Sequence, residues 1–397
     1  MTEKLELTEG LFTAEEYLTR IETVQERLAA SGFDGIVVAD PANMFYLTGY
    51  NAWSFYTPQI LYVPTAGAPL LIMRNMDAVG AHRTAVISGD TALGYPENMV
   101  HRRDAHPGSW MAHQLREHGY ADGTLKRIAM EGDSHFFSVR TFHAMAAELP
   151  EWELVDSGEL VNWVRVVKSP AEIELMRHAG GVVTRVMDTA IGLIREGRPV
   201  NEIAGEVMRE QAYGDGDYPA IVPMFPRGAG SDTPHLTWTS EAVGRNEPVL
   251  VELAGVHHRY HTPLARTVSV GTPSREFDHL SKVTLEALQA ALELMVPGNT
   301  PAQVSEAWNS VLARYGLEKP SRLGYSIGVG YPPDWGERTI SLRSEDRTVF
   351  QENMTFHVIA GMWLPGSGFE TSESVRVAEG GPEMLSSVPR GLAVVGE

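Results

Sequence analysis

Apolar positions in the first 165 residues follow helical spacing in some segments and strand-like runs in others. From Glu16 to Ala30, leucine, isoleucine and valine recur on one face, which predicts an amphipathic helix. Apolar runs at 35–39 and 60–73 predict strands, and the turn residues 65–68 divide the second run into a hairpin. Further helices are expected at 108–118 and 139–148, and further strands at 128–131 and 152–155. Alternating strands and helices predict an α/β layer.

The clearest domain boundary is a helix start at Ser169. Pro170 suits the first helical position, and Glu172 stands three residues after the serine. In this capping box, the serine and glutamate side chains each satisfy the backbone N–H of the other. Apolar residues then keep a helical spacing as far as Ile194. We therefore expect an N-terminal domain over 1–165 and a second domain over 166–397.

The spacing of apolar residues in the second segment predicts a mixture of amphipathic helices and long apolar strands. Helices are expected at 202–212, 277–295 and 301–315, and strands at 248–253, 260–270, 354–364 and 374–377. The glycine-rich stretch Gly324–Gly330 lacks the spacing and the preceding strand of a dinucleotide-binding loop.

Composition narrows the possible functions. The 51 acidic and 32 basic residues give a net charge of −19, which disfavours nucleic acid and anionic membranes as partners. With no cysteine, the chain has no disulfide, no thiolate metal site and no cysteine nucleophile. No apolar run reaches the roughly 18–20 residues of a membrane span, and the charged N-terminus does not resemble a signal peptide. We expect a soluble, cytoplasmic protein.

One histidine cluster invites a metal interpretation. His257 and His261 would share a face on a single strand, and His258 would point away. A metal site needs a third ligand, which the neighbouring sequence does not supply. We therefore expect these histidines to be structural or surface residues.

Motifs along most of the chain resemble prolidase, aminopeptidase P and creatinase. The resemblance implies a creatinase-type α/β domain followed by a pita-bread catalytic domain, with a strand and turn at the first motif. The motifs, in family order, are Asn43-Met-Phe-Tyr-Leu-Thr-Gly49, Val167-Lys-Ser-Pro-Ala-Glu-Ile-Glu-Leu-Met-Arg177, Pro234-His235, Thr262-Pro-Leu-Ala-Arg266-Thr267, Gly324-Tyr-Ser-Ile-Gly328 and Asn353-Met-Thr-Phe-His-Val-Ile-Ala-Gly361.

The chain departs from this family at its metal ligands. The family's metallopeptidases hold two metal ions through five side chains, and the corresponding positions here are Glu252, Pro263, Tyr325, Ile359 and Ser372. Proline and isoleucine have no side-chain donor, and hard divalent ions need several oxygen or nitrogen ligands. The resemblance therefore implies a site without metal and without any other cofactor.

Creatinase is the metal-free member of the family, and the match to it is partial. His235 falls on its catalytic histidine, and Phe55 falls on a residue that reaches the partner subunit's site. Its catalytic glutamates fall on Ala265 and Ile359, and an arginine of its N-terminal loop falls on Thr57. Creatine is therefore disfavoured as the substrate, whereas a homodimer is implied.

The chain is more similar to ectoine hydrolases, a creatinase-like branch. The segments that carry this resemblance are the aromatic-rich 43–59, the strand around Glu252 and Gly255, and Glu370-Thr-Ser-Glu-Ser-Val-Arg376. The resemblance implies a small zwitterionic substrate, ectoine or hydroxyectoine. Its cyclic amidine would be opened without metal to an N-acetyl-2,4-diaminobutyrate, which a deacetylase would then consume.

The implied chemistry assigns catalytic roles to Glu252 and His235. Glu252 would attack the amidine carbon or activate a water, and His235 would pass a proton to the leaving nitrogen. Trp53, Phe55 and Tyr56 would hold the delocalised cation against their ring faces.

Two further residues are expected to bind the substrate. Tyr325 replaces a ligand and would line the cavity, and Glu373 neighbours Ser372. Because strand alternation turns Glu373 away from Ser372, a bulge would be needed to bring it in. Two alternatives remain open: another metal-free amidinohydrolase, and a non-catalytic module that binds a peptide or protein.

Overall fold

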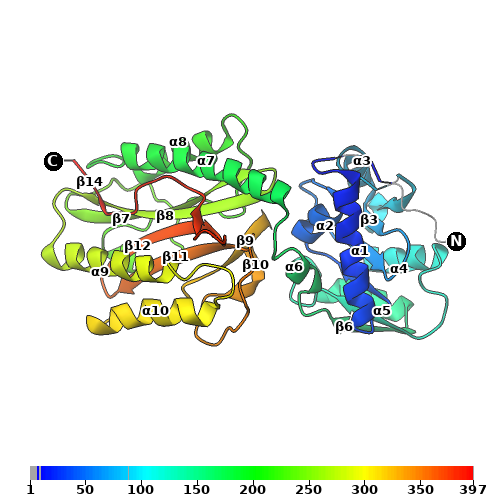
Figure 1. Cartoon of the computed structure of the whole chain (residues 1–397). Coiled ribbons are helices and arrows are strands. Elements are labelled where there is room, and N and C mark those ends of the chain that lie inside the picture. Colours follow the sequence, from blue (N-terminus) through cyan, green and yellow to red (C-terminus); the bar gives the residue numbers. More distant parts are fainter. Residues whose placement is uncertain (1–6, 9, 88, 397) are drawn as a thin grey trace. The chain divides into compact units, whose positions relative to one another are not determined.

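The computed structural model describes residues 7–8, 10–87 and 89–396 (Figure 1). The chain forms two compact units, Met1–Arg165 and Val166–Glu397. Each unit is built around its own β-sheet. No helix among the described residues combines the length and the apolar character needed to cross a membrane.

The first unit has a six-stranded mixed sheet in the order β4-β3-β2-β1-β5-β6. Its core lies on both faces of the sheet: Ile36 of β1 packs with Ile21 of α1, whereas the adjacent Val37 packs with Met111 of α4. Successive strand residues point to opposite faces, so a sheet covered on both sides has fully apolar strands. The elements are α1 (Ala14–Ala30), β1 (Gly35–Val38), α2 (Pro41–Thr48), β2 (Ile60–Pro64), β3 (Leu70–Arg74), α3 (Asn75–Thr84), β4 (Ala92–Tyr95), α4 (Pro107–Glu117), β5 (Lys126–Met130), α5 (Val139–Glu148), β6 (Trp152–Asp156) and α6 (Leu160–Val164).

The first family motif is a helix, so the expected strand and turn at Asn43–Gly49 is wrong. Asp40 caps α2 by accepting a hydrogen bond from the Ala42 N–H, Pro41 occupies the first turn, and Gly49 ends the helix with φ 71°. These are ordinary start and stop signals for a helix. The hairpin of β2 and β3 is confirmed by their antiparallel pairing.

Asn43 has a structural role in this unit. Its amide nitrogen donates to Glu131 and Asn162, and its oxygen accepts from Arg165. The buried Glu131 also accepts the backbone N–H groups of Ala39 and Asp40. This network ties the start of α2 to β5 and α6, and it accounts for the motif without a catalytic role.

The second unit is a largely antiparallel sheet in the order β13-β12-β11-β9-β8-β14, with β10 paired to β9 and β7 paired to β8. The capping box expected at Ser169 and Glu172 is confirmed at the start of α7. The elements are α7 (Pro170–Leu193), α8 (Val200–Ala212), β7 (Glu247–His257), β8 (Tyr260–Val270), α9 (Arg275–Leu292), α10 (Pro301–Arg314), β9 (Gly324–Tyr331), β10 (Asp334–Ser341), β11 (Thr355–Leu364), β12 (Ser367–Arg376), β13 (Glu383–Met384) and β14 (Ala393–Val395).

Two strands differ from the sequence-based expectation. The glycine-rich stretch at 324–330 is strand β9, whose glycines bring neighbouring backbones close: a Cβ on Gly324 would lie 2.1 Å from the His357 carbonyl oxygen. Strand β12 begins at Ser367, seven residues before the expected start at 374. A strand is predicted from alternating apolar and polar residues, and β12 lacks this pattern because several of its buried residues are polar.

Helices α7 and α9 cover one face of this sheet. Helix α7 packs on β7 and β8, where a Cβ on Gly255 would lie 2.1 Å from the Ala179 carbonyl oxygen. Helix α9 packs on β11 and β12, where the Phe277 and Phe369 ring centroids are 6.1 Å apart, and α10 packs on α9 (Figure 1). We call the face turned away from these helices the inner face.

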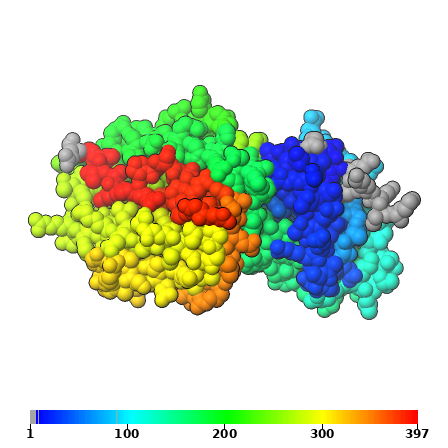
Figure 2. All heavy atoms as spheres, viewed as in Figure 1, coloured from blue at the N-terminus to red at the C-terminus, as the bar shows by residue number. Residues whose placement is uncertain are grey.

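The C-terminal segment is fixed on the surface of this unit beside α7 and α9. Figure 2 shows it, in red, between the green α7 region and the yellow α9 region. Glu383 pairs with Arg177 of α7, and Arg390 donates to Gln289 of α9. The Leu385 carbonyl approaches Gly180 so closely that a Cβ there would lie 1.9 Å from its oxygen.

Adjacent glycines of α7 allow a matched stability test. Gly180→Ala should destabilise the protein by about 2–3 kcal/mol, because the new methyl group meets backbone that cannot rotate away. A Cβ on Gly181 would meet nothing within 4 Å, so Gly181→Ala should stabilise the helix by about 0.5–1 kcal/mol. Thermal denaturation of the two variants measures both effects, and equal Tm values would contradict the close packing.

Candidate active site

Strand register gathers a set of polar side chains on the inner face. Tyr325 of β9 stands opposite His357 of β11, and in β12 Ser372 stands opposite Ile359. Residues directly opposite in an antiparallel pair share a face, as do residues two apart in one strand. Glu370 therefore shares this face with Ser372.

Glu252 joins the same face from the other side of the sheet. Its strand neighbours Val251 and Leu253 pack with α7 and α8 in the helix-covered core, so Glu252 points the other way. Its side chain is 8% exposed. Burial raises the pKa of both Glu252 and Tyr325; the charge of Glu370 adds to the rise at Glu252, and the charge of Glu252 adds to the rise at Tyr325. The three groups therefore lie close enough to interact in one buried region.

A hydrogen-bonded network joins three of these residues, Ser372, His357 and Tyr325, to Ala265 and Trp335. The Ala265 N–H donates to Ser372 Oγ over 2.6 Å, and Ser372 Oγ lies 2.7 Å from His357 Nε2. His357 Nδ1 lies 3.4 Å from the Tyr325 hydroxyl, which accepts from Trp335 Nε1 over 2.8 Å. Burial lowers the pKa of His357 to about 3, so the imidazole linking Ser372 and Tyr325 is neutral.

Burial shifts both carboxyl groups toward their protonated forms. It raises the pKa of Glu252 well above the ordinary value, and the negative charge of Glu370 raises it further. Burial also raises the pKa of Glu370, to about 7, although the positive charge of Lys319 opposes the rise. Burial and the charge of Glu370 therefore favour the protonated form of Glu252, while Glu370 changes charge near neutral pH.

Lys319 supplies the cation beside this pair. Burial lowers its pKa to about 8, and the charge of Glu370 partly opposes that change. Its ammonium donates to the Gly361 carbonyl and to Ser321, and it lies 4.3 Å from the centroid of the Trp363 ring. A buried carboxylate with a nearby ammonium is a group poised to exchange protons near neutrality.

The donor set on the inner face does not fit a two-metal centre. Pro263 and Ile359 offer no side-chain donor. Tyr325 and Ser372 are already engaged by protein N–H groups. Around Glu252, no three histidine or acidic side chains of the described residues converge as ligands.

Glu373 does not belong to this group, which corrects the expected substrate contact. Strands β11 and β12 pair without a register shift from Thr355 to Leu364, so no bulge turns Glu373 inward. It is buried on the opposite face, where Arg266 and Arg390 contact the same carboxylate oxygen over 2.8 and 3.1 Å. Glu373 is therefore a structural partner of Arg266.

His235 lies in an exposed turn near the edge of β7. Its φ is 66°, and its side chain is open to solvent. The following Leu236 carbonyl accepts from the Phe225 N–H, and Met224 exchanges backbone hydrogen bonds with Glu252. The turn is thus connected to the strand that carries Glu252, and proton transfer by His235 stays a prediction.

The three predicted aromatic residues belong to the first unit. Trp53 is 57% exposed and Tyr56 is 59% exposed, whereas Phe55 is half-buried between Trp53 and Phe136. Their exposure argues against a role in the core of that unit. Contact with a substrate cation stays a prediction.

Glu370, His357 and Lys319 were not recognised from the sequence. The signal for two of them is strand alternation: Glu370 is two residues from Ser372, and His357 is two residues from Ile359. Both therefore share the face of a family ligand position. Lys319 lies outside any helix or strand, and no periodic pattern marks it.

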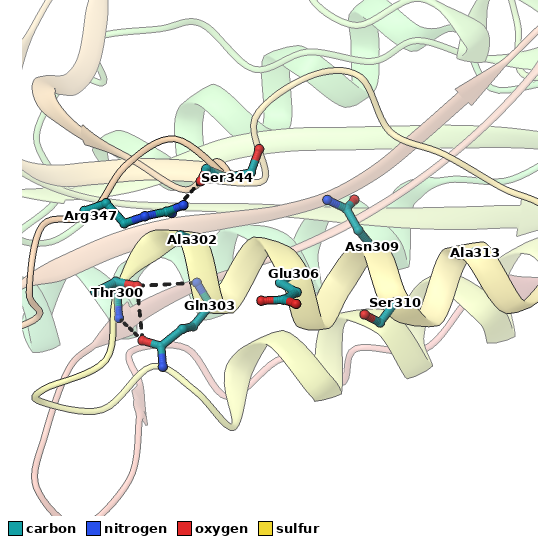
Figure 3. Close-up of a pocket in the computed structure, with 9 residues that line it drawn as sticks. All are labelled: Thr300, Ala302, Gln303, Glu306, Asn309, Ser310, Ala313, Ser344 and Arg347. Atoms are coloured by element: carbon teal, nitrogen blue, oxygen red, sulfur yellow. Dashed lines mark hydrogen bonds between the residues drawn. The ribbon is translucent and has the colours of Figure 1, made fainter.

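Two surface grooves lie beside α10. One, of about 680 Å³, is shown in Figure 3. Thr300 and Gln303 form a hydrogen bond with each other at one end of this groove, and Glu306 of α10 lines it. None of the predicted site residues lines it. A second groove, of about 390 Å³, includes Lys319 and Arg322 in its lining.

The histidine cluster differs from the expected single strand. Strand β7 ends at His257 and β8 begins at Tyr260, so His257 and His261 lie on different strands. His261 is buried, and its Nε2 accepts the Ala220 N–H. His257 lies instead beside His178 and Asp215, a three-residue arrangement that local sequence did not reveal.

Comparison with known proteins agrees with this architecture. Residues 20–167 match the Creatinase/Prolidase N-terminal domain, and residues 174–379 match Metallopeptidase family M24. The chain is 40% identical to ectoine hydrolase of Halomonas elongata, over 96% of this chain and 98% of that protein. It is 21% identical to the Xaa-Pro dipeptidase of Pyrococcus furiosus, over 94% and 99% of the two chains.

Solved structures show the same fold. A recombinant prolidase from Thermococcus sibiricus superposes with a TM-score of 0.84 at 19% identity, covering 96% of this chain and 99% of that one. A dipeptidase PepE from Mycobacterium ulcerans superposes with a TM-score of 0.81 at 21% identity, over 97% and 100%. The expected fold class is thereby confirmed. The chain is a hydrolase of the M24 family, in which a creatinase-type α/β domain precedes a pita-bread catalytic domain.

Proposed function

We propose that this protein hydrolyses the cyclic amidine ring of ectoine without a metal ion. The observation that carries the proposal is the buried pair Glu252 and Glu370 on the inner face, at a site whose donor set does not fit two metal ions. The similarity to ectoine hydrolase over 96% of the chain supports the choice of substrate.

The protonation of the pair suits the hydrolysis of an amidine. The amidinium carbon of ectoine is electrophilic, so attack by water needs a base more than a Lewis acid. Glu370 as carboxylate would take a proton from the attacking water, and Glu252 would give its proton to the ring nitrogen as the C–N bond breaks. The products are one amide and one amine, which together make an N-acetyl-2,4-diaminobutyrate.

This assignment changes the role first expected for Glu252. A nucleophile or base must be ionised, whereas burial and the charge of Glu370 favour the protonated form of Glu252. A bound amidinium cation would favour ionisation of both carboxyl groups, so covalent attack by one of them remains an alternative. Trapping the quenched reaction for a mass increase on the protein distinguishes the two routes.

The homodimer and the aromatic cation contact are part of the proposal. The implied dimer would bring Phe55 to the partner subunit's site, with Trp53 and Tyr56 beside it. Sedimentation at micromolar concentration should give the mass of two chains. A monomer with full turnover would remove the partner contribution.

The decisive experiment is turnover of ectoine by untagged, chelator-treated protein. We expect an N-acetyl-2,4-diaminobutyrate, identified by NMR and mass spectrometry, with a rate unchanged by added Mn²⁺ or Zn²⁺. Turnover that appears only with metal would contradict metal independence. Turnover of creatine or another guanidine in place of ectoine would favour a different amidinohydrolase, and binding without any turnover would favour a non-catalytic module.

His235→Ala tests the proton donor. Because Glu252 holds a proton within the buried group, we expect this variant to lose less activity than Glu252→Gln. A loss in His235→Ala equal to that in Glu252→Gln, at unchanged KM, would return the donor role to the histidine.

A further inference from the structure

We propose that His178, Asp215 and His257 form a surface site for a transition-metal ion of the Zn²⁺ class, separate from the inner face. The three residues come from the middle of α7, the loop after α8 and the end of β7. Each offers one ligand atom, and these atoms lie within 4.8 Å of one another. The inference does not depend on the proposed function.

A hydrogen bond already present leaves one ring nitrogen of His257 available to bind a metal ion. Its Nδ1 lies 3.0 Å from the Asp215 carbonyl oxygen, which can only accept, so Nδ1 carries the proton. Nε2 is then the nitrogen with a free lone pair. Metal-binding histidines in proteins are oriented in this way by a carbonyl or carboxylate on the other nitrogen.

His178 and Asp215 form the other half of the site. His178 Nε2 lies 2.5 Å from Asp215 Oδ2, and the rings of His178 and His257 stack with centroids 4.3 Å apart and an interplanar angle of 19°. An ion would replace the proton of the His178–Asp215 hydrogen bond. All three side chains remain accessible, since His178 and Asp215 are exposed and His257 is half-buried.

The backbone holds the Asp215 loop against β7. The Asp217 N–H donates to the Val256 carbonyl, and a Cβ on Gly216 would lie 1.9 Å from the Gln211 carbonyl oxygen. The loop therefore cannot swing away freely. Zinc ligands lie about 2.0–2.2 Å from the ion in a tetrahedral arrangement, which places them about 3.3–3.6 Å apart. Binding therefore needs side-chain rotations that open the 2.5 Å contact between His178 and Asp215 and bring the more distant ligand atoms, now within 4.8 Å, closer together.

The donor types favour zinc over calcium or magnesium. Two imidazoles and one carboxylate match borderline ions, whereas Ca²⁺ and Mg²⁺ prefer all-oxygen sites. The fourth position is open to water. His258, whose ring centroid is 4.4 Å from that of His257, stands next to it. A bound ion would connect α7, the loop and β7, and so stabilise the folded state.

The test is calorimetric titration of untagged, metal-free protein with ZnCl₂, together with Tm. We expect one equivalent to bind and Tm to rise. His178→Gln, Asp215→Asn and His257→Gln should each weaken binding by at least about 10- to 100-fold, because loss of a residue that only supports a ligand already has an effect of that size. Binding of Cu²⁺ should show coupling to two nitrogens in the EPR spectrum.

His113→Gln provides the matched control. His113 is exposed and lies 3.7 Å from the Glu148 carboxylate, but this pair is not among the convergent groups of three ligands in the described residues. The control should bind zinc as the unsubstituted protein does. The proposal would be overturned if zinc did not bind stoichiometrically, or if all three site variants bound zinc as tightly as the unsubstituted protein. Ectoine turnover is measured in parallel, so the two proposals succeed or fail separately.

Discussion

Glu252→Gln is expected to lower kcat for ectoine by about 10²–10⁴-fold, the usual contribution of a positioned acid or base. Glutamine keeps the shape of the side chain and cannot give up a proton to the leaving nitrogen. KM should change little, because the amide can still occupy the same space. Steady-state kinetics on the untagged protein measure the loss.

The same substitution should not destabilise the fold at neutral or alkaline pH. The folded-state pKa of Glu252 lies well above the ordinary value of 4.5. The folded protein therefore holds a proton that the unfolded chain has lost, and stability falls as pH rises from about 4.5 toward the folded pKa. Glutamine does not titrate, so the Tm of Glu252→Gln should gain on that of the unsubstituted protein as pH rises above about 4.5.

Glu306→Gln is the control for this experiment. Glu306 is exposed and lines the groove in Figure 3. Its replacement should leave both kcat and Tm unchanged. Full activity of Glu252→Gln would show that the mechanism does not use Glu252. Loss of activity in Glu306→Gln would indicate that the groove in Figure 3 contributes to activity.

Glu370→Gln is expected to reduce kcat/KM by a similar factor and to change its pH dependence. The pKa of Glu370 is about 7, so its base form appears as pH rises through 7. For the unsubstituted protein, kcat/KM should therefore rise between about pH 6 and pH 8. This limb should disappear in Glu370→Gln, because glutamine has no base form.

Glu373→Gln is the matched comparison, three residues along the same strand on the opposite face. It leaves Arg266 buried without its carboxylate, so stability should fall by about 3–5 kcal/mol. The pH dependence of kcat/KM should keep its limb near 7. If Glu373→Gln removed that limb and Glu370→Gln kept it, the assignment of the two faces would be wrong.

Local patterns were sufficient for most of the fold. The amphipathic face of α1, the capping box of α7 and the hairpin of β2 and β3 are each set by neighbouring residues, which sequence displays directly. For helix α2, the local start and stop signals Asp40, Pro41 and Gly49 predict the helix correctly, whereas the family resemblance predicts a strand and turn.

The site was only partly predictable for a different physical reason. Glu252, Tyr325 and Ser372 were found from family positions, yet Glu370 and His357 needed the register between strands. His178 and Asp215 meet His257 only because α7 and the loop after α8 pack against β7, and no local pattern shows that contact. Pairings between distant segments set these positions, whereas periodicity describes one segment at a time.

The Ser372–His357–Tyr325 network also bears on how such a site could evolve. Introducing one family metal ligand, for example by Ile359→Glu, would add a third carboxyl group on the face that carries Glu252 and Glu370, and Lys319 alone would have to balance it. Restoring Ser372 to an acid would in addition cost the hydrogen bonds to His357 and Ala265. If the proposed metal-free function holds, a two-metal centre could be built here only by several substitutions made together, because single ones disturb the buried network.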